Sequence, residues 1–127
     1  MVPPHLKYTK THLWCKVEDN IVTLGITEQG LKQLGTIHFL ELPDIDDDVL
    51  TEVAIAEVET EEAAVELFSP VDGVVVQVHK ALEDYPERIA ADPYGKGWLV
   101  KIRLENPSQL EGLLSATQYE AFLAGKG

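Results

Sequence analysis

The residues of this chain that could do chemistry are mostly carboxylates, and they are densest between Glu57 and Glu66. A carboxylate acts as a general acid or base when an apolar cleft shifts its pKa toward neutrality. The acids of this stretch instead have other acids as neighbours: Glu57, Glu59, Glu61, Glu62 and Glu66. Crowded like charges are typical of a solvated surface. The sequence therefore favours an acidic surface over an acid–base catalytic site.

Metal binding and nucleophilic catalysis have less support. The histidines, His5, His12, His38 and His79, are scattered, and Cys15 has no second thiol, so no ligand spacing typical of a metal site occurs. Neither a G-x-S-x-G motif nor a glycine-rich phosphate loop is present. Cys15 lies among apolar strand residues, which favours a packed thiol over a reactive one, and His38 is expected to be structural. We expect no metal site and no enzymatic activity.

A hairpin is predicted to carry the acidic stretch. The strand-like pattern of residues 51–59 and the short apolar run at 65–68 predict two strands, with a charged connection made of Thr60, Glu61, Glu62 and Ala63. The tip of such a hairpin suits a tethered group, because rigid strands hold it within reach of a modifying enzyme. An amide bond at the tip would require a lysine amine, which neither Glu61 nor Glu62 provides.

The rest of the chain predicts many short strands and few helices. Strands are expected at residues 12–17, 21–25, 36–42, 74–78 and 98–104. Helices are expected at Glu28–Leu34, at 83–91 and in two tail segments, whose capping boxes would pair Asn106 with Gln109 and Ser115 with Gln118. Residues 44–48 form an acidic, exposed loop. This pattern is typical of a β-rich sandwich or barrel with helical additions.

Size and charge exclude several classes of function. The chain has 127 residues, the size of one domain (1–127), and a formal net charge of −12. Such acidity disfavours binding to nucleic acid and to anionic membranes, and it suits docking to basic proteins. No segment reaches the ~20 apolar residues that cross a bilayer, and the first residues do not resemble a signal peptide. We expect a cytoplasmic monomer.

Short motifs along the chain carry a family resemblance. They are H-L-K-Y-T-K-T-H (5–12), V-T-L-G-I-T (22–27), L-G-T-I-H-F-L-E-L-P (34–43), S-P-V-D-G (69–73), A-L-E-D-Y-P-E (81–87), D-P-Y-G (92–95), G-W-L-V-K-I (97–102) and Y-E-A-F-L (119–123). Each motif is short, but their order and spacing together are very specific. Over nearly its whole length the chain resembles the H protein of the glycine cleavage system.

The resemblance implies a mainly β fold, a lipoyl-type barrel-sandwich hybrid with short helices and a C-terminal helical segment. It also implies a non-enzymatic carrier. The lipoyl arm of such a carrier collects an aminomethyl group at a decarboxylase, delivers it to a tetrahydrofolate-dependent transferase, and is reoxidised by dihydrolipoyl dehydrogenase. Some relatives carry lipoate for sulfur-oxidising complexes instead.

The resemblance breaks at the residue that matters most for a carrier. The arm-bearing segment of the family reads approximately E-S-V-K-A, whereas residues 59–63 read E-T-E-E-A, so the lysine position is Glu62. The nearest lysines, Lys32 and Lys80, lie well outside the hairpin. A second departure is Leu13, which replaces a glutamate near the loaded arm in an H-E-W motif. Because Glu61 and Leu13 also depart from the pattern, we interpret the chain as a paralogue rather than a single-site variant.

Two hypotheses follow from the resemblance and its departures. The first is a non-lipoylated docking, scaffold or regulatory protein, with no covalent cofactor. Its partners would be glycine cleavage components, a lipoate ligase or transferase, or a sulfur-oxidising complex. The alternative is a carrier protein of glycine cleavage or a related pathway that holds lipoate, the family cofactor, non-covalently or at an unusual residue.

Overall fold

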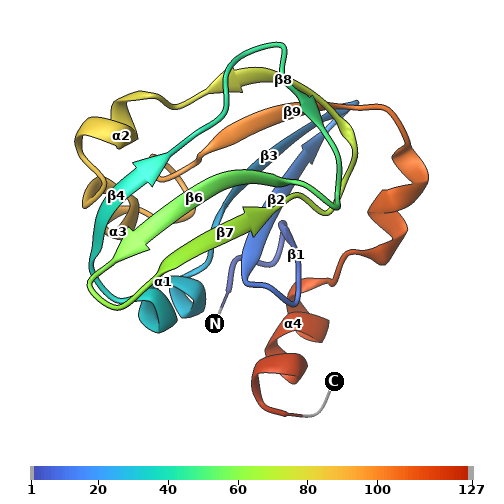
Figure 1. Ribbon diagram of the computed structural model, residues 1–127. Coiled ribbons are helices and arrows are strands. Elements are labelled where there is room, and N and C mark those ends of the chain that lie inside the picture. Colours follow the sequence, from blue (N-terminus) through green and yellow to red (C-terminus); the bar gives the residue numbers. More distant parts are fainter. Residues whose placement is uncertain (1, 126–127) are drawn as a thin grey trace.

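Two antiparallel sheets make up the body of the protein in a computed structural model that describes residues 2–125 (Figure 1). The larger sheet has the order β1-β2-β3-β9-β8-β5 and the smaller one β4-β6-β7. The larger sheet contains β1 (Lys7–Tyr8), β2 (Leu13–Glu18), β3 (Ile21–Ile26), β9 (Val100–Leu104), β8 (Gly73–Val78) and β5 (Asp48–Val49). The smaller sheet contains β4 (Ile37–Glu41), β6 (Ala54–Thr60) and β7 (Ala64–Phe68). The predicted mainly β, two-sheet architecture is present.

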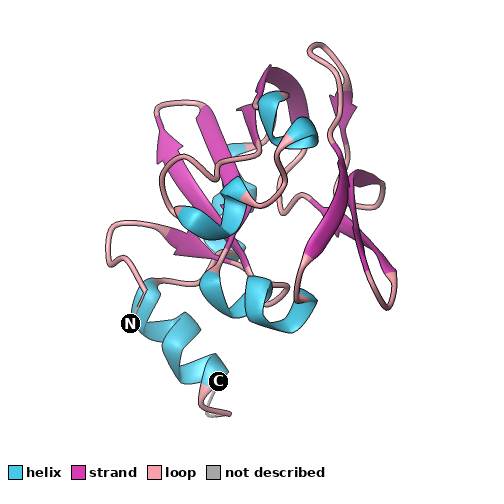
Figure 2. Ribbon diagram, turned by 90° about the vertical axis from the view of Figure 1, so that its left-hand side faces the viewer, coloured by secondary structure: helices cyan, strands magenta, loops and turns pink. Residues whose placement is uncertain are grey.

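The helices are short and gather at the ends of the sheets. They are α1 (Glu28–Leu34), α2 (Ala81–Asp84), α3 (Arg88–Ala91), the 3-10 helix η1 (Pro107–Gly112) and α4 (Ala116–Leu123). Figures 1 and 2 show α1, α2 and α3 at one end of the two sheets, with α4 standing apart from them below the sheets.

The core lies between the two sheets. Leu40 and Val58 come from the smaller sheet and Val75 and Ile102 from the larger one, and each is at most 1% exposed. Each such side chain contributes roughly 1.5–3 kcal/mol through removal of apolar surface from water. Alternation along the strands places the polar neighbours of these residues on the outer faces.

A second, aromatic cluster fixes α4 against the beginning of the chain. Tyr8 and Tyr119 stack with ring centroids 4.8 Å apart, and Trp14 lies buried in the same cluster. The indole of Trp14 also requires a glycine on the neighbouring strand, because a Cβ at Gly25 would come within 2.3 Å of its ring. The C-terminal helix is thereby joined to β1 and β2.

Local signals explain the first helix and the last. The Thr27 hydroxyl accepts a hydrogen bond from the Gly30 amide at 3.1 Å, which caps α1, and Gly35 ends that helix with a φ of 76°. In α4 the predicted capping box of Ser115 and Gln118 is present. The sequence predicted both helices at these positions.

Three predictions about the remaining elements were wrong or incomplete. The single helix expected at 83–91 is interrupted, since Pro86 cannot continue it, and α2 and α3 replace it. The Asn106 cap is present, but the Gln109 side chain bonds Asp72 instead of completing a capping box. Strands β1 and β5 were not expected, and β5 takes Asp48 from the predicted loop.

Candidate functional site

The predicted hairpin tip is formed by β6, β7 and the three residues between them, and it lies beside α1 (Figure 1). Strand pairing ends with Glu59 opposite Ala64. The Thr60 amide then donates to the Ala63 carbonyl at 2.9 Å. The Thr60 hydroxyl accepts from the amides of Glu62 at 3.3 Å and Ala63 at 3.4 Å. One threonine side chain therefore organises the turn and holds Glu62 at its apex.

The two glutamates of the tip have different surroundings. Glu61 lies 3.4 Å from Nε2 of His38 on β4, and their side chains are 79% and 50% exposed. Glu62 is also exposed, and no salt bridge to it exists among residues 2–125. His38, which was expected to be structural, is exposed, and its ring lies toward Glu61 of the tip. The tip is thus solvated and negatively charged.

A cleft of about 280 Å³ separates the tip from the end of α1. Thr60, Glu61 and Glu62 form one wall, and residues 32–36 form the other, so Lys32 shares this cleft with the tip. The sequence reading placed Lys32 well outside the hairpin. Pairing of β4 with β6 sets Ile37 opposite Thr60, and this pairing draws the end of α1 back to the tip. Lys32 therefore lines the same cleft as the tip, although it lies well outside the hairpin in the sequence.

Leu13 lies in a different environment from the tip. Its side chain is 3% exposed, belongs to the main core and packs around a small hollow with Ile55, Leu67 and Phe68. Leu13 does not line the cleft beside Glu62. The structure does not bring these two residues together, so a role for position 13 in contacting an arm stays a proposal.

The neighbouring His12 belongs to a hydrogen-bond network with α4. Its Nδ1 lies 2.7 Å from the Tyr119 hydroxyl, which lies 2.8 Å from the hydroxyl of Thr27. Burial lowers the pKa of His12 below its ordinary value, so the neutral ring is favoured. The Tyr119 hydroxyl can donate a hydrogen bond to an unprotonated Nδ1 while it accepts one from the Thr27 hydroxyl. The network satisfies all three groups and ties the termini together.

The described part of the chain lacks the usual arrangements for catalysis. No carboxylate of residues 2–125 is buried, and no group of three or more histidine, cysteine, aspartate or glutamate side chains there could hold a metal ion. Cys15 is fully buried, and burial raises the pKa of its thiol to about 12, as expected for a packed thiol. Within the same residues, no helix has the length and apolar character to cross a membrane.

Comparison with known proteins identifies the family. The profile described as glycine cleavage H-protein matches residues 6–126. The chain belongs to this family. It is 46% identical to the glycine cleavage system H protein of Staphylococcus carnosus over 122 residues, which cover 96% of this chain and 97% of that protein. The glycine cleavage system H protein of Staphylococcus haemolyticus is 47% identical, with the same coverage.

A solved structure agrees with these sequence matches. The crystal structure of a glycine cleavage system H protein from Mycobacterium marinum superposes with a TM-score of 0.83 at 32% identity, covering 98% of this chain and 99% of that one. The predicted lipoyl-type barrel-sandwich fold is thereby confirmed. Because H proteins are carriers rather than enzymes, family membership also supports the expectation that this chain is not an enzyme.

Proposed function

We propose that this chain works as the H-protein-type carrier of glycine cleavage or a related lipoate-dependent pathway, presenting its hairpin tip to partner enzymes. The observation that carries this proposal is the family match at residues 6–126, which also supports reading 1–127 as one domain. The relatives that match over nearly their whole length are named glycine cleavage system H protein. These names favour the carrier hypothesis over the docking hypothesis.

The tip residue limits how a carrier of this kind could hold lipoate. We propose that Glu62 occupies the position of the lipoyl-accepting lysine, on the basis of its place at the apex of the turn and of the E-T-E-E-A sequence around it. A carboxylate has no nucleophilic nitrogen, so a lipoyl amide cannot form there. Lipoate must then be bound elsewhere or without a covalent bond.

Lys32 is the acceptor that best fits a covalent carrier. Its side chain is exposed and lines the cleft next to Glu62, so an arm attached there would begin beside the usual attachment point. Because Lys32 is exposed on the surface of α1, a modifying enzyme could reach its amine. The same cleft, about 280 Å³ in volume, is the candidate place for non-covalent lipoate.

A second candidate function is favoured by Glu62 itself. A chain with an intact H-protein framework and no amine at the tip could occupy the docking sites of lipoate-using or lipoate-attaching enzymes without being modified. Such a protein would act as a scaffold, competitor or regulator. The exposed Glu61 and Glu62 would then contact the partner enzyme directly, and neither would have to carry a lipoyl group.

Intact-mass measurement separates the two candidates. The natural chain, Lys32→Arg and Glu62→Lys are each incubated with lipoate, ATP and a lipoate ligase. If the natural chain gains one lipoyl group and Lys32→Arg does not, the covalent carrier proposal is supported. If only Glu62→Lys gains the group, attachment at Lys32 is excluded. Native mass spectrometry of the natural chain with free lipoate then tests non-covalent carriage, and absence of a complex leaves the docking function.

The docking function has its own test. The natural chain is immobilised and exposed to purified glycine cleavage components and to lipoate ligase, with Glu62→Lys as a parallel bait. Binding of at least one of these proteins supports docking. The docking function is ruled out if the natural chain retains none of these proteins while Glu62→Lys retains lipoate ligase.

A further inference from the structure

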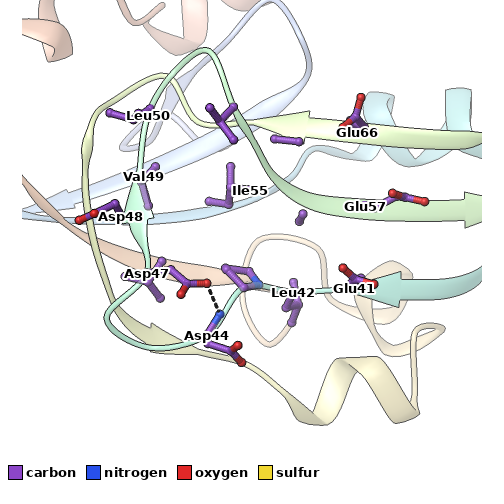
Figure 3. Close-up of a pocket in the computed structure, with 15 residues that line it drawn as sticks. Glu41, Leu42, Asp44, Asp47, Asp48, Val49, Leu50, Ile55, Glu57 and Glu66 are labelled. Atoms are coloured by element: carbon purple, nitrogen blue, oxygen red, sulfur yellow. Dashed lines mark hydrogen bonds between the residues drawn. The ribbon is translucent and has the colours of Figure 1, made fainter.

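A hollow larger than the cleft beside Glu62 lies away from the tip, at the end of the smaller sheet where β6 begins. It has a volume of about 540 Å³ and lies between the outer face of β4, β6 and β7 and the segment 44–53 that precedes β6 (Figure 3). We call it the acidic groove. None of its lining residues also lines the cleft beside Glu62, so it can be considered independently of lipoate attachment.

A row of three glutamates forms one wall of the acidic groove. Glu41 on β4 pairs in register with Glu57 on β6, and Glu57 pairs with Glu66 on β7. Figure 3 shows the three side chains one above another on neighbouring strands. Like charges directly opposite on adjacent strands destabilise a sheet. No salt bridge to any of the three exists among residues 2–125.

The opposite wall adds more negative charge. Asp44, Asp47 and Asp48 line the groove, and the Asp47 carboxylate accepts a hydrogen bond from the Asp44 amide at 2.9 Å. The nearby cation is Lys80, whose ammonium lies 3.3 Å from Asp44, and it does not line the groove. Six acidic residues therefore line the groove and no basic residue does, although Asp44 is paired with Lys80 outside it. The lining carries an excess of negative charge.

Apolar side chains also line the acidic groove. Leu50 and Val53 at its rim are 53% and 58% exposed, and the buried Leu42, Val49 and Val75 form its floor. Contiguous exposed apolar surface that is rimmed by polar residues can mark a site that binds another protein. The groove thus offers both apolar contact and concentrated charge of one sign.

We propose that the acidic groove binds an extended, basic segment of a partner protein. Lysine or arginine side chains of the segment would neutralise the glutamate row, and an apolar side chain between them would pack on Leu50 and Val53. Charge complementarity selects this occupant. A second copy of the chain carries a net charge of −12 and nucleic acid carries phosphates, so charge repulsion disfavours both as occupants.

A short peptide probe tests the proposal on the intact protein. The probe is a blocked peptide of sequence lysine–leucine–lysine–valine–lysine, titrated at 0.15 M salt, where weak long-range attraction is screened beyond about 8 Å. Amide chemical shifts report where it binds. We expect saturable binding with shifts at Glu41, Glu57, Glu66 and residues 48–53. A peptide with glutamate in place of lysine, and one with serine in place of leucine and valine, should each bind at least tenfold more weakly.

Matched variants separate the groove from overall charge. The triple variant Glu41→Gln, Glu57→Gln, Glu66→Gln should weaken peptide binding about tenfold, or about 1.4 kcal/mol. The control triple variant Glu18→Gln, Glu105→Gln, Glu111→Gln removes the same charge from exposed positions outside the groove and should change affinity less than twofold.

A second matched pair tests the apolar contact. Leu50→Ser should weaken binding severalfold, whereas Ile45→Ser, at a residue 57% exposed and outside the groove, should not.

Equal loss of peptide affinity in the two triple variants would show general charge attraction and overturn the proposal. Non-saturable binding, shifts spread over the whole surface, or a stable dimer by sedimentation that covers the groove would overturn it as well.

Discussion

Tyr119 joins three parts of the chain through one hydroxyl group. That hydroxyl lies within 2.8 Å of both His12 Nδ1 and the Thr27 hydroxyl, and the Tyr119 side chain is fully buried. A buried polar group that loses its partner costs roughly 1–3 kcal/mol. This single hydroxyl group therefore contributes to holding α4 against the rest of the fold.

Removal of this hydroxyl should destabilise the protein. We expect Tyr119→Phe to lower the free energy of unfolding by about 1–3 kcal/mol, because His12 Nδ1 loses this partner and Thr27 keeps only the hydrogen bond from the Gly30 amide. The control is Tyr94→Phe, since the Tyr94 hydroxyl accepts one exposed hydrogen bond, from the Glu28 amide at 3.1 Å. Urea denaturation measures both. Equal losses in the two variants would contradict the role assigned to the network.

His12 should make stability depend on pH near neutrality. Burial lowers its pKa in the folded protein, so the unfolded chain binds more protons at pH values between the folded and unfolded pKa. The contribution of His12 is therefore complete above the ordinary histidine pKa of about 6.5 and is lost as the pH falls toward the folded pKa. His12→Asn, which tolerates the positive φ of 69°, should flatten this slope below the ordinary histidine pKa of about 6.5. An unchanged slope would rule out His12 as its source.

The β4-β6-β7 sheet places like charges opposite one another on neighbouring strands, which lowers its stability. Its central strand places Glu57 between Glu41 and Glu66, although alternation along the strands buries Leu40 and Val58 correctly. A sheet optimised only for stability would carry neutral or opposite charges on this outer face.

Substitution at the centre of the glutamate row should stabilise the fold. We expect Glu57→Gln to raise the free energy of unfolding by roughly 0.2–1 kcal/mol, because it removes two repulsive cross-strand pairs. Glu59→Gln is the control, since Glu59 lies opposite Phe39 and Ala64 and has no like-charged partner across the sheet. Thermal unfolding distinguishes the variants, and no difference between them would mean that the row is fully screened by solvent.

Sequence patterns predicted the long strands better than the short elements. Strands β3, β6 and β8 have alternating or β-branched residues that define them locally. Strands β1 and β5 contain two residues each, and they are strands only because they pair with β2 and β8, as Tyr8 does with Trp14. For the same reason, the sequence did not predict that Lys32 shares a cleft with the tip, because this placement depends on the pairing of β4 with β6. Tertiary pairing cannot be read from local periodicity.

The whole molecule is acidic, with a net charge of −12. The tip and the acidic groove carry part of the negative charge and lie toward opposite ends of β6. Both surfaces would attract basic proteins, and long-range attraction accelerates such encounters. The family framework and the acidic surfaces together fit a protein whose function is to present one hairpin tip to other proteins.

The most direct measurement is the mass of a double variant, Lys32→Arg with Glu62→Lys, after incubation with lipoate, ATP and a lipoate ligase. Lys32→Arg removes the competing amine in the cleft, and Glu62→Lys restores one at the apex of the turn. We predict a gain of one lipoyl group, because the Thr60-organised turn presents its apex as an H-protein carrier does. A folded double variant that gains no lipoyl group would contradict the assignment of Glu62 to the acceptor position.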